Sequence, residues 1–171
     1  MKGPVFHAEP AGRHAPDMSY GPRPGSRPDS DSARIRARLA PCPEIDCVRH
    51  LLPPARIAAA ELRAAETRTG ADRVLVNEGV LTDRDYVRAL ARHHGLALQS
   101  LRDTPRAACP VNDDDLLSGL ACGIIPIRSR GEMIWVVAPW QMSARFLIAW
   151  LQRHPDMRSR LRVTTMADLR D

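Results

Sequence analysis

The chain has 171 residues, which is enough for one domain of ordinary size or for two small subdomains with a flexible extension. Its formal net charge is +5, but residues 1–43 hold seven basic and four acidic residues and so account for +3 of it. Residues 44–171 are therefore nearly balanced in charge. This balance argues against a nucleic-acid-binding domain, and we expect no nucleic acid as a partner.

The sequence also lacks the usual signals for membrane insertion and export. No apolar stretch reaches the ~18 residues that a membrane span needs, and residues 1–20 lack the basic start and apolar core of a signal peptide. We therefore expect a soluble, cytoplasmic chain whose four cysteines are reduced. Cys109 and Cys122 are expected to be small apolar residues of the core.

Residues 1–43 have the composition of a disordered tail. They hold 8 of the 15 prolines and 4 of the 10 glycines, and their apolar residues are isolated and follow no period. Such a segment cannot bury enough apolar surface to offset the entropy of ordering. The arginines at positions 34, 36 and 38 are either simply solvated or an electrostatic tether to an anionic lipid or polymer.

Residues 44–98 predict a small helical subdomain. Glu44 to Leu52 is expected to form a short helix, because Pro53 and Pro54 restrict the residues before them. Residues 55–67 are rich in alanine and predict a helix that packs closely against a neighbour.

The next two helices are punctuated by glycine. The first is expected to end at Gly79 and the second at Gly95, since glycine readily takes the left-handed conformation that ends a helix. Thr82 is expected to cap the second helix through its hydroxyl group. No catalytic group lies inside this pattern, which is typical of a binding or docking module.

Residues 99–171 predict a second subdomain that contains a sheet. A helix is expected over 113–121, two strands over 124–128 and 132–138 joined by a hairpin, and a helix over 142–153. Phe146 is expected on the stripe of that helix that covers the sheet. The fold class is therefore α+β, with a helical subdomain followed by an α/β subdomain that has a short mixed or antiparallel sheet. Both faces of strand 132–138 are apolar, so we expect Trp135 and Trp150 in the core and only Trp140 exposed.

Residues Gly70 to His93 resemble, without a gap, the repeated unit of MshEN-type domains, the N-terminal domains of type II secretion and type IV pilus assembly ATPases. The order of the elements predicted downstream continues this likeness over about residues 44–171, and the likeness implies a final strand and helix in LRVTTMADLRD at 161–171. The matching positions of the unit are Leu75, Val76, Gly79, Leu81, Thr82, Tyr86, Ala89 and Leu90.

A variant of this domain resembles the chain more closely. The stretches from His50 to Leu98 and GIIPIRSRGEMIWVVAP at 123–139 are similar to the variant at the N-terminus of bacterial membrane-bound family 2 glycosyltransferases. This likeness implies the leading part of a polysaccharide or glycan synthase at the inner face of the bacterial inner membrane. The implied partner is the catalytic region of the same or of a partner membrane protein.

The ATPase family also implies cyclic di-GMP as a ligand. The positions of its opening arginine, its glycine and its closing glutamine hold Gly70, Asp72 and His93 here. Loss of the arginine and gain of an aspartate weaken the attraction for an anionic dinucleotide. Arg68, Arg73 and His93 are the candidate nucleotide contacts, and Arg92 is a further arginine that could substitute.

The remaining candidates for chemistry have simpler interpretations. His93 and His94 are adjacent on one helix and point about 100° apart, so they cannot face one metal ion. The D-x-D spacing of residues 113–115 is that of a metal and sugar-nucleotide site, but the triplet opens a helix, where acidic residues favour the dipole. The sequence has no phosphate-binding loop, nucleophile elbow or H-E-x-x-H motif. We predict no catalytic residue, no metal and no cofactor in this chain.

Three functions are open from the sequence. The first is a non-catalytic regulatory or docking module of a glycosyltransferase. The second is a sensor that binds cyclic di-GMP through a degenerate unit. The third is an adaptor of a secretion or pilus ATPase.

Overall fold

The computed structural model describes residues 41–170. Helices come first along this part of the chain, and a four-stranded sheet with interspersed helices follows, so the α+β prediction is confirmed. The predicted disordered tail, with its arginine cluster, lies outside the described residues except for residues 41–43. Within the described part, every helix is too short or too polar to cross a membrane.

The helical region consists of four elements: η1 (Pro43–Val48), α2 (Pro54–Thr67), α3 (Ala71–Asn77) and α4 (Asp83–His94). The helix expected over 44–52 is a 3-10 helix that ends at Val48, so this prediction was too long. Prolines at 43, 53 and 54 bracket the segment and leave room for little more than a single short helix before the chain turns.

The helix boundaries around α4 follow local chemistry, as predicted. The Thr82 hydroxyl oxygen accepts a hydrogen bond from the Asp85 backbone N–H at 3.1 Å. Gly95 takes a φ of +66°, and the N–H of the following Leu96 donates to the Ala91 carbonyl at 2.8 Å, which closes the helix. Gly79, after α3, also has a left-handed φ of +69°.

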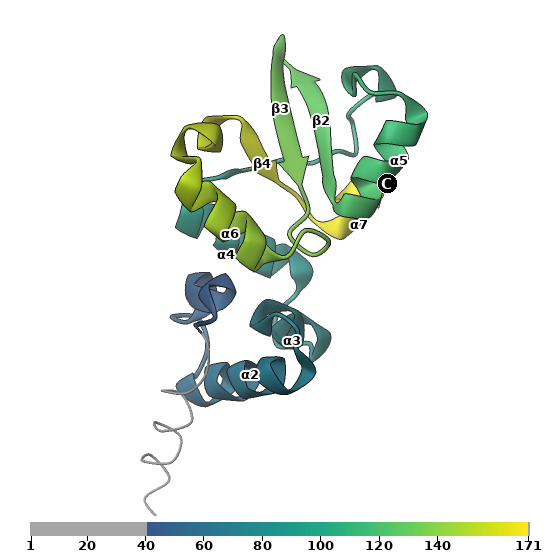
Figure 1. The fold of residues 1–171 in the computed structure, drawn as a ribbon. Coiled ribbons are helices and arrows are strands. Elements are labelled where there is room, and N and C mark those ends of the chain that lie inside the picture. Colours follow the sequence, from purple (N-terminus) through teal and green to yellow (C-terminus); the bar gives the residue numbers. More distant parts are fainter. Residues whose placement is uncertain (1–40, 171) are drawn as a thin grey trace, which may run out of the picture.

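The sheet is mixed and has the order β1-β4-β3-β2; β4, β3 and β2 can be followed in Figure 1. The strands are β1 (Ala97–Leu98), β2 (Ile124–Ser129), β3 (Glu132–Val137) and β4 (Leu161–Val163). β2 and β3 form an antiparallel hairpin, whereas β4 runs parallel to both β3 and β1. The intervening helices are η2 (Arg106–Ala108), α5 (Asp113–Cys122), α6 (Ala144–Arg153), η3 (Pro155–Ser159) and α7 (Met166–Arg170).

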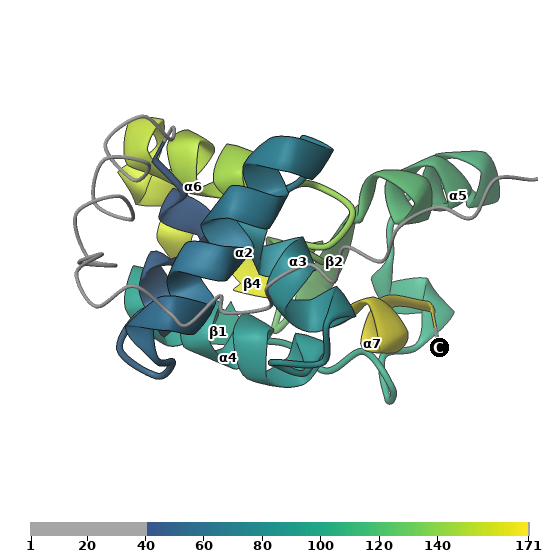
Figure 2. The ribbon, with the colours of Figure 1, turned by 90° about the horizontal axis from the view of Figure 1, so that it is seen from below.

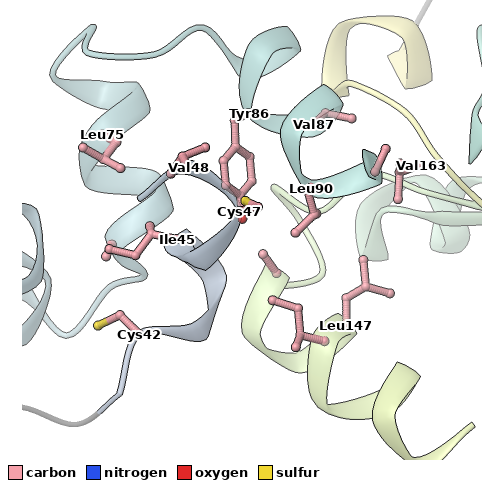
Figure 3. Close-up of a cluster of buried hydrophobic side chains, with 14 of the residues drawn as sticks. Cys42, Ile45, Cys47, Val48, Leu75, Tyr86, Val87, Leu90, Leu147 and Val163 are labelled. Carbon is pink, nitrogen blue, oxygen red and sulfur yellow. The ribbon is translucent and has the colours of Figure 1, made fainter. Parts of the chain in front are cut away.

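The two faces of the sheet pack against different helices. One face, with Val137 and Val163, shares a hydrophobic cluster with α6 and with the helices of residues 43–94 (Figure 3). The other face, with Ile134 and Val136, packs against α7 and partly against α5. Figure 1 shows α5 and α6 on opposite sides of the hairpin, and Figure 2 shows α5 set apart from α2, α3 and α4.

α5 covers its face of the sheet only loosely. Leu116 and Leu120 are partly buried against the sheet, but Leu117 is 65% exposed. Cys122 lies two residues beyond Leu120, about 200° around the helix, and is exposed. The expectation that Cys122 is a core residue was therefore wrong, whereas Cys109 is buried as expected.

Glu44 joins four helices and is completely buried. Its carboxylate accepts two hydrogen bonds from the Arg145 guanidinium on α6, at 2.8 and 3.0 Å, and one from the Ala71 backbone N–H at the start of α3, at 3.1 Å. Its backbone carbonyl accepts a hydrogen bond from the Tyr86 hydroxyl on α4 at 2.8 Å. One residue of η1 therefore fixes the positions of α3, α4 and α6.

These contacts also decide the charge state of Glu44. Burial by itself raises the pKa of a carboxyl group, but the hydrogen bonds from Arg145 and from the Ala71 N–H outweigh it, and the pKa of Glu44 lies below its usual value. Glu44 is therefore ionised at neutral pH. Its contribution to stability is present above the pKa of the unfolded chain and is lost as the pH falls through the lower native pKa.

Replacement of Glu44 by alanine is expected to lower the free energy of unfolding by about 2–4 kcal/mol at pH 7. The variant leaves the Ala71 N–H and the Arg145 guanidinium without their acceptor and opens a cavity between the helices. Urea denaturation measures the change. Glu66→Ala is the control, because Glu66 forms only an exposed ion pair with Arg63 at 3.5 Å; it should stay within about 0.5 kcal/mol of the wild type. Equal losses in both variants would contradict the central role of Glu44.

Candidate functional site

The most distinctive concave feature of the described residues is an apolar groove between α6 and the adjacent face of the sheet. It has a volume of about 360 Å³. We call it the α6 groove. It is lined by aliphatic and aromatic residues, namely Ile124, Trp135, Val137, Met142, Phe146, Leu147, Trp150, Met157 and Leu161.

The lengths of the strands explain why the groove is open. β4 has three residues and pairs with β3 only from Trp135 to Val137. The outer half of β3 therefore has no neighbour on that side, and the hairpin of β2 and β3 reaches past the helices that flank it (Figure 1). Trp135 is 36% exposed and Met133, two residues further out on the same face, is 37% exposed.

α6 supplies the opposite wall. Its inward stripe, Ala144, Leu147, Ile148 and Leu151, is buried in the shared core. Phe146 and Trp150 are one turn apart on the adjacent side of the helix, and this places both rings at the groove. Phe146 is 58% exposed, and the Trp150 ring lies 4.9 Å from that of His154 in a tilted arrangement.

The structure corrects the predictions for four aromatic residues. Trp135 and Phe146 were expected to be covered by packing between the strand and the α6 segment, but both are exposed at the groove because α6 covers only the inner part of the sheet face. Trp150 is half-buried rather than enclosed. Trp140, which was expected to be the exposed one, is also half-buried and packs on the opposite face of the sheet.

The three candidate nucleotide contacts have separate surroundings. Arg73 donates a hydrogen bond to the Trp140 carbonyl at 2.6 Å and lies over its ring, 5.8 Å from the centroid. The exposed His93 ring packs edge-on against His94, with 4.8 Å between centroids. Arg68 ends α2 in a left-handed conformation and lines a cavity of about 300 Å³ beside Arg145. The structure does not bring these three side chains together.

Most of the charges around the cavity beside Arg68 are already paired. Arg145 lines it but is neutralised by Glu44, and Glu61 on its wall is bound by Arg49 at 2.6 Å. A dinucleotide with two phosphates would need several uncommitted donors at one place. This cavity offers chiefly Arg68.

Asp72 is buried, with only 3% of its surface exposed. Burial, with a further contribution from the charge of Glu44, raises the pKa of Asp72 to about 6. The carboxylate folds back over Gly70, where any side chain would collide with it. The lack of a side chain at position 70 and the position of the Asp72 carboxylate therefore depend on each other.

Other candidates have structural roles. The carboxylate of Asp113 pairs with Arg106 at 2.7 Å, and the Asn112 side chain accepts a hydrogen bond from the Asp115 N–H at 2.8 Å, so the acidic triplet starts α5 as expected. Within residues 41–170, no three His, Cys, Asp or Glu side chains are close enough together to hold a metal ion.

Sequence reasoning missed the most important polar pair and part of the groove. Glu44 and Arg145 are 101 residues apart, and no local pattern links them. Met142 lies in the loop before α6, and Met157 lies in η3. No sequence pattern marked either residue as part of a groove. One clue to the groove was in the sequence. Strand 132–138 has aromatic and aliphatic residues on both faces, and together they present more apolar surface than a single covering helix can bury.

No family model matches the chain, and no curated protein matches it.

Replacement of Asp72 by asparagine is expected to change how stability depends on pH. The native pKa of about 6 exceeds the ordinary value of 3.8, so the stability linked to this carboxyl group is complete below pH 3.8 and is lost as the pH rises through 6. The free energy of unfolding of Asp72→Asn, relative to the wild type, should rise by about 2–3 kcal/mol between pH 4 and pH 7. Urea denaturation at the two pH values measures it. A difference that does not vary with pH would contradict this assignment.

Cyclic di-GMP is expected not to bind. Position 70 has no side chain, Asp72 adds a negative charge, and Arg73 is engaged by Trp140. Isothermal titration should show no heat of binding at ~100 μM dinucleotide, with a binding domain of the ATPase type as the positive control. A saturable heat that disappears in Arg73→Ala would contradict this expectation.

Proposed function

We propose that the chain is a non-catalytic docking module and that the α6 groove receives part of a protein partner. The observation that carries the proposal is the groove itself: nine apolar lining residues, two of them tryptophans, around about 360 Å³. Aromatic residues and methionine are enriched where proteins meet. Methionine also adapts its shape to different surfaces.

The chemistry of the lining supports binding rather than reaction. A catalytic site needs side chains that transfer protons, attack a substrate or stabilise charge. The lining of the α6 groove includes no carboxylate, imidazole, thiol, amine or guanidinium group. The buried ionisable residues Glu44 and Asp72 lie among the helices and do not line it.

The identity of the partner is taken from the likeness of two stretches, residues 50–98 and 123–139, to the N-terminal region of bacterial membrane-bound family 2 glycosyltransferases. On this basis the partner is the catalytic region of such an enzyme, in the same or in another polypeptide. The place of action is the cytoplasmic face of the inner membrane. The module would hold the catalytic region or regulate it through contact.

A photo-crosslinking amino acid at position 146 tests the partner in cells that naturally encode the chain. Phe146 lies at the mouth of the groove, so crosslinks should form to peptides of a family 2 glycosyltransferase catalytic region. Position 117 is the matched control, because Leu117 is equally exposed but lies on α5, on the other side of the hairpin. It should not give these crosslinks.

Two results would contradict the proposal in different ways. Crosslinks from position 146 to a secretion or pilus ATPase would instead support an adaptor of that machine. Glycosyl transfer by these 171 residues alone would show that the chain is catalytic.

A further inference from the structure

We infer that the occupant of the α6 groove is an amphipathic helix with acidic flanks. This inference rests on the docking function proposed above and adds the chemistry of the partner. It is drawn from the charge around the groove, from its shape and from what the rest of the chain offers.

The net positive charge of the described residues is concentrated in the segment that builds the groove. Residues 124–162 contain seven arginines and two acidic residues, a net charge of +5. Residues 44–123 contain ten arginines and twelve acidic residues, a net charge of −2. The apolar surface and the excess of arginine therefore coincide in one part of the fold.

Four of these arginines are neighbours, along the chain or across a strand pair, of residues that line the groove or of Met133 beside it. Arg128 pairs with Met133 across the hairpin, on the same face as Trp135. The Arg160 carbonyl accepts a hydrogen bond from the Trp135 N–H at 2.8 Å. Arg153 lies three residues after Trp150, and Arg158 directly follows Met157.

All four of these arginines are exposed, and in the described part of the chain none of them makes an ion pair. A partner with acidic residues beside its apolar anchors would gain charge pairs here. Such pairs raise the rate of association and select against basic partners. Charge complementarity therefore favours an acidic ligand.

The shape of the groove favours a helix over a lipid surface. Its floor is made of the buried residues Val137, Leu147 and Leu161, and its rim carries Phe146 and Trp135. A bilayer would take up protruding aromatic residues but would leave a concavity empty. Apolar side chains at positions i, i+3 or i+4, and i+7 of a helix fill a groove of this kind.

Other parts of the same chain fit the groove less well. Residues 1–43 carry a net charge of +3, so the positive groove would repel them. α5 begins with three aspartates, but Leu117 is its one strongly exposed large apolar residue. A second copy that docked through α5 would thus bring a single large apolar anchor to the groove. The structure points to a separate acidic partner segment.

A phage-display selection on the full 171-residue chain tests the inference with random helical peptides of about 16 residues, long enough for four turns. Enriched peptides should carry apolar residues at helical spacing and a net negative charge. The leading peptide, once synthesised, should bind Phe146→Glu at least about tenfold more weakly than the wild type. It should also bind Arg153→Glu more weakly, and binding to the wild type should weaken as salt increases.

Leu117→Glu is the matched control, because it adds the same charge on the opposite side of the hairpin and should bind as the wild type does. Circular dichroism checks that each variant is folded. Phe146 and Arg153 are exposed, so both variants should be folded.

The outcomes separate the two proposals. Enriched peptides that need Phe146 but are neutral or basic would overturn the acidic partner and leave the docking function standing. If no enriched peptide depends on Phe146, the docking function fails as well. Binding to vesicles containing phosphatidylserine that is lost in Phe146→Glu would identify a membrane as the occupant. Sedimentation should show no self-association that depends on Phe146; if it did, the occupant would be a second copy.

Discussion

The structure depends on the burial of the Glu44 carboxylate. Three N–H groups from the Arg145 guanidinium and the Ala71 backbone bind it, and Tyr86 holds the carbonyl of the same residue. Removal of a carboxylate from water is costly unless such partners are fixed in place. The interaction therefore holds η1, α3, α4 and α6 in one arrangement. Because α6 forms a wall of the groove, the pair also determines the shape of the candidate binding surface.

The groove follows from an incomplete cover of the sheet. β4 ends after three residues, and α6 uses its inward stripe to pack on the shared core. The outer part of one sheet face and the side of α6 with Phe146 and Trp150 are then left facing each other across open space. A small domain has few elements with which to cover such a surface. A partner that supplies the missing layer would complete the packing, and the surrounding arginines would select an acidic one.

Features set by local chemistry could be predicted from the sequence, whereas those set by distant contacts could not. The Thr82 cap, the left-handed glycines at 79 and 95, the β2–β3 hairpin and the α+β class all follow from neighbouring residues. The Glu44–Arg145 pair needs the complete fold. Trp135 was expected in the core, because the alternation of side chains along a strand places it on an apolar face. That alternation does not say how far the short strand β4 and the helix α6 extend along this face, and Trp135 remains 36% exposed.

The most direct test of the central claim is fluorine NMR of the chain with 5-fluorotryptophan at its three tryptophans. Trp135 and Trp150 line the groove, whereas Trp140 packs on the opposite face of the sheet and serves as an internal reference. Saturation with an acidic amphipathic peptide should shift the resonances of Trp135 and Trp150 and leave that of Trp140 in place. A shift of Trp140 alone, or no shift at saturation, would contradict the account.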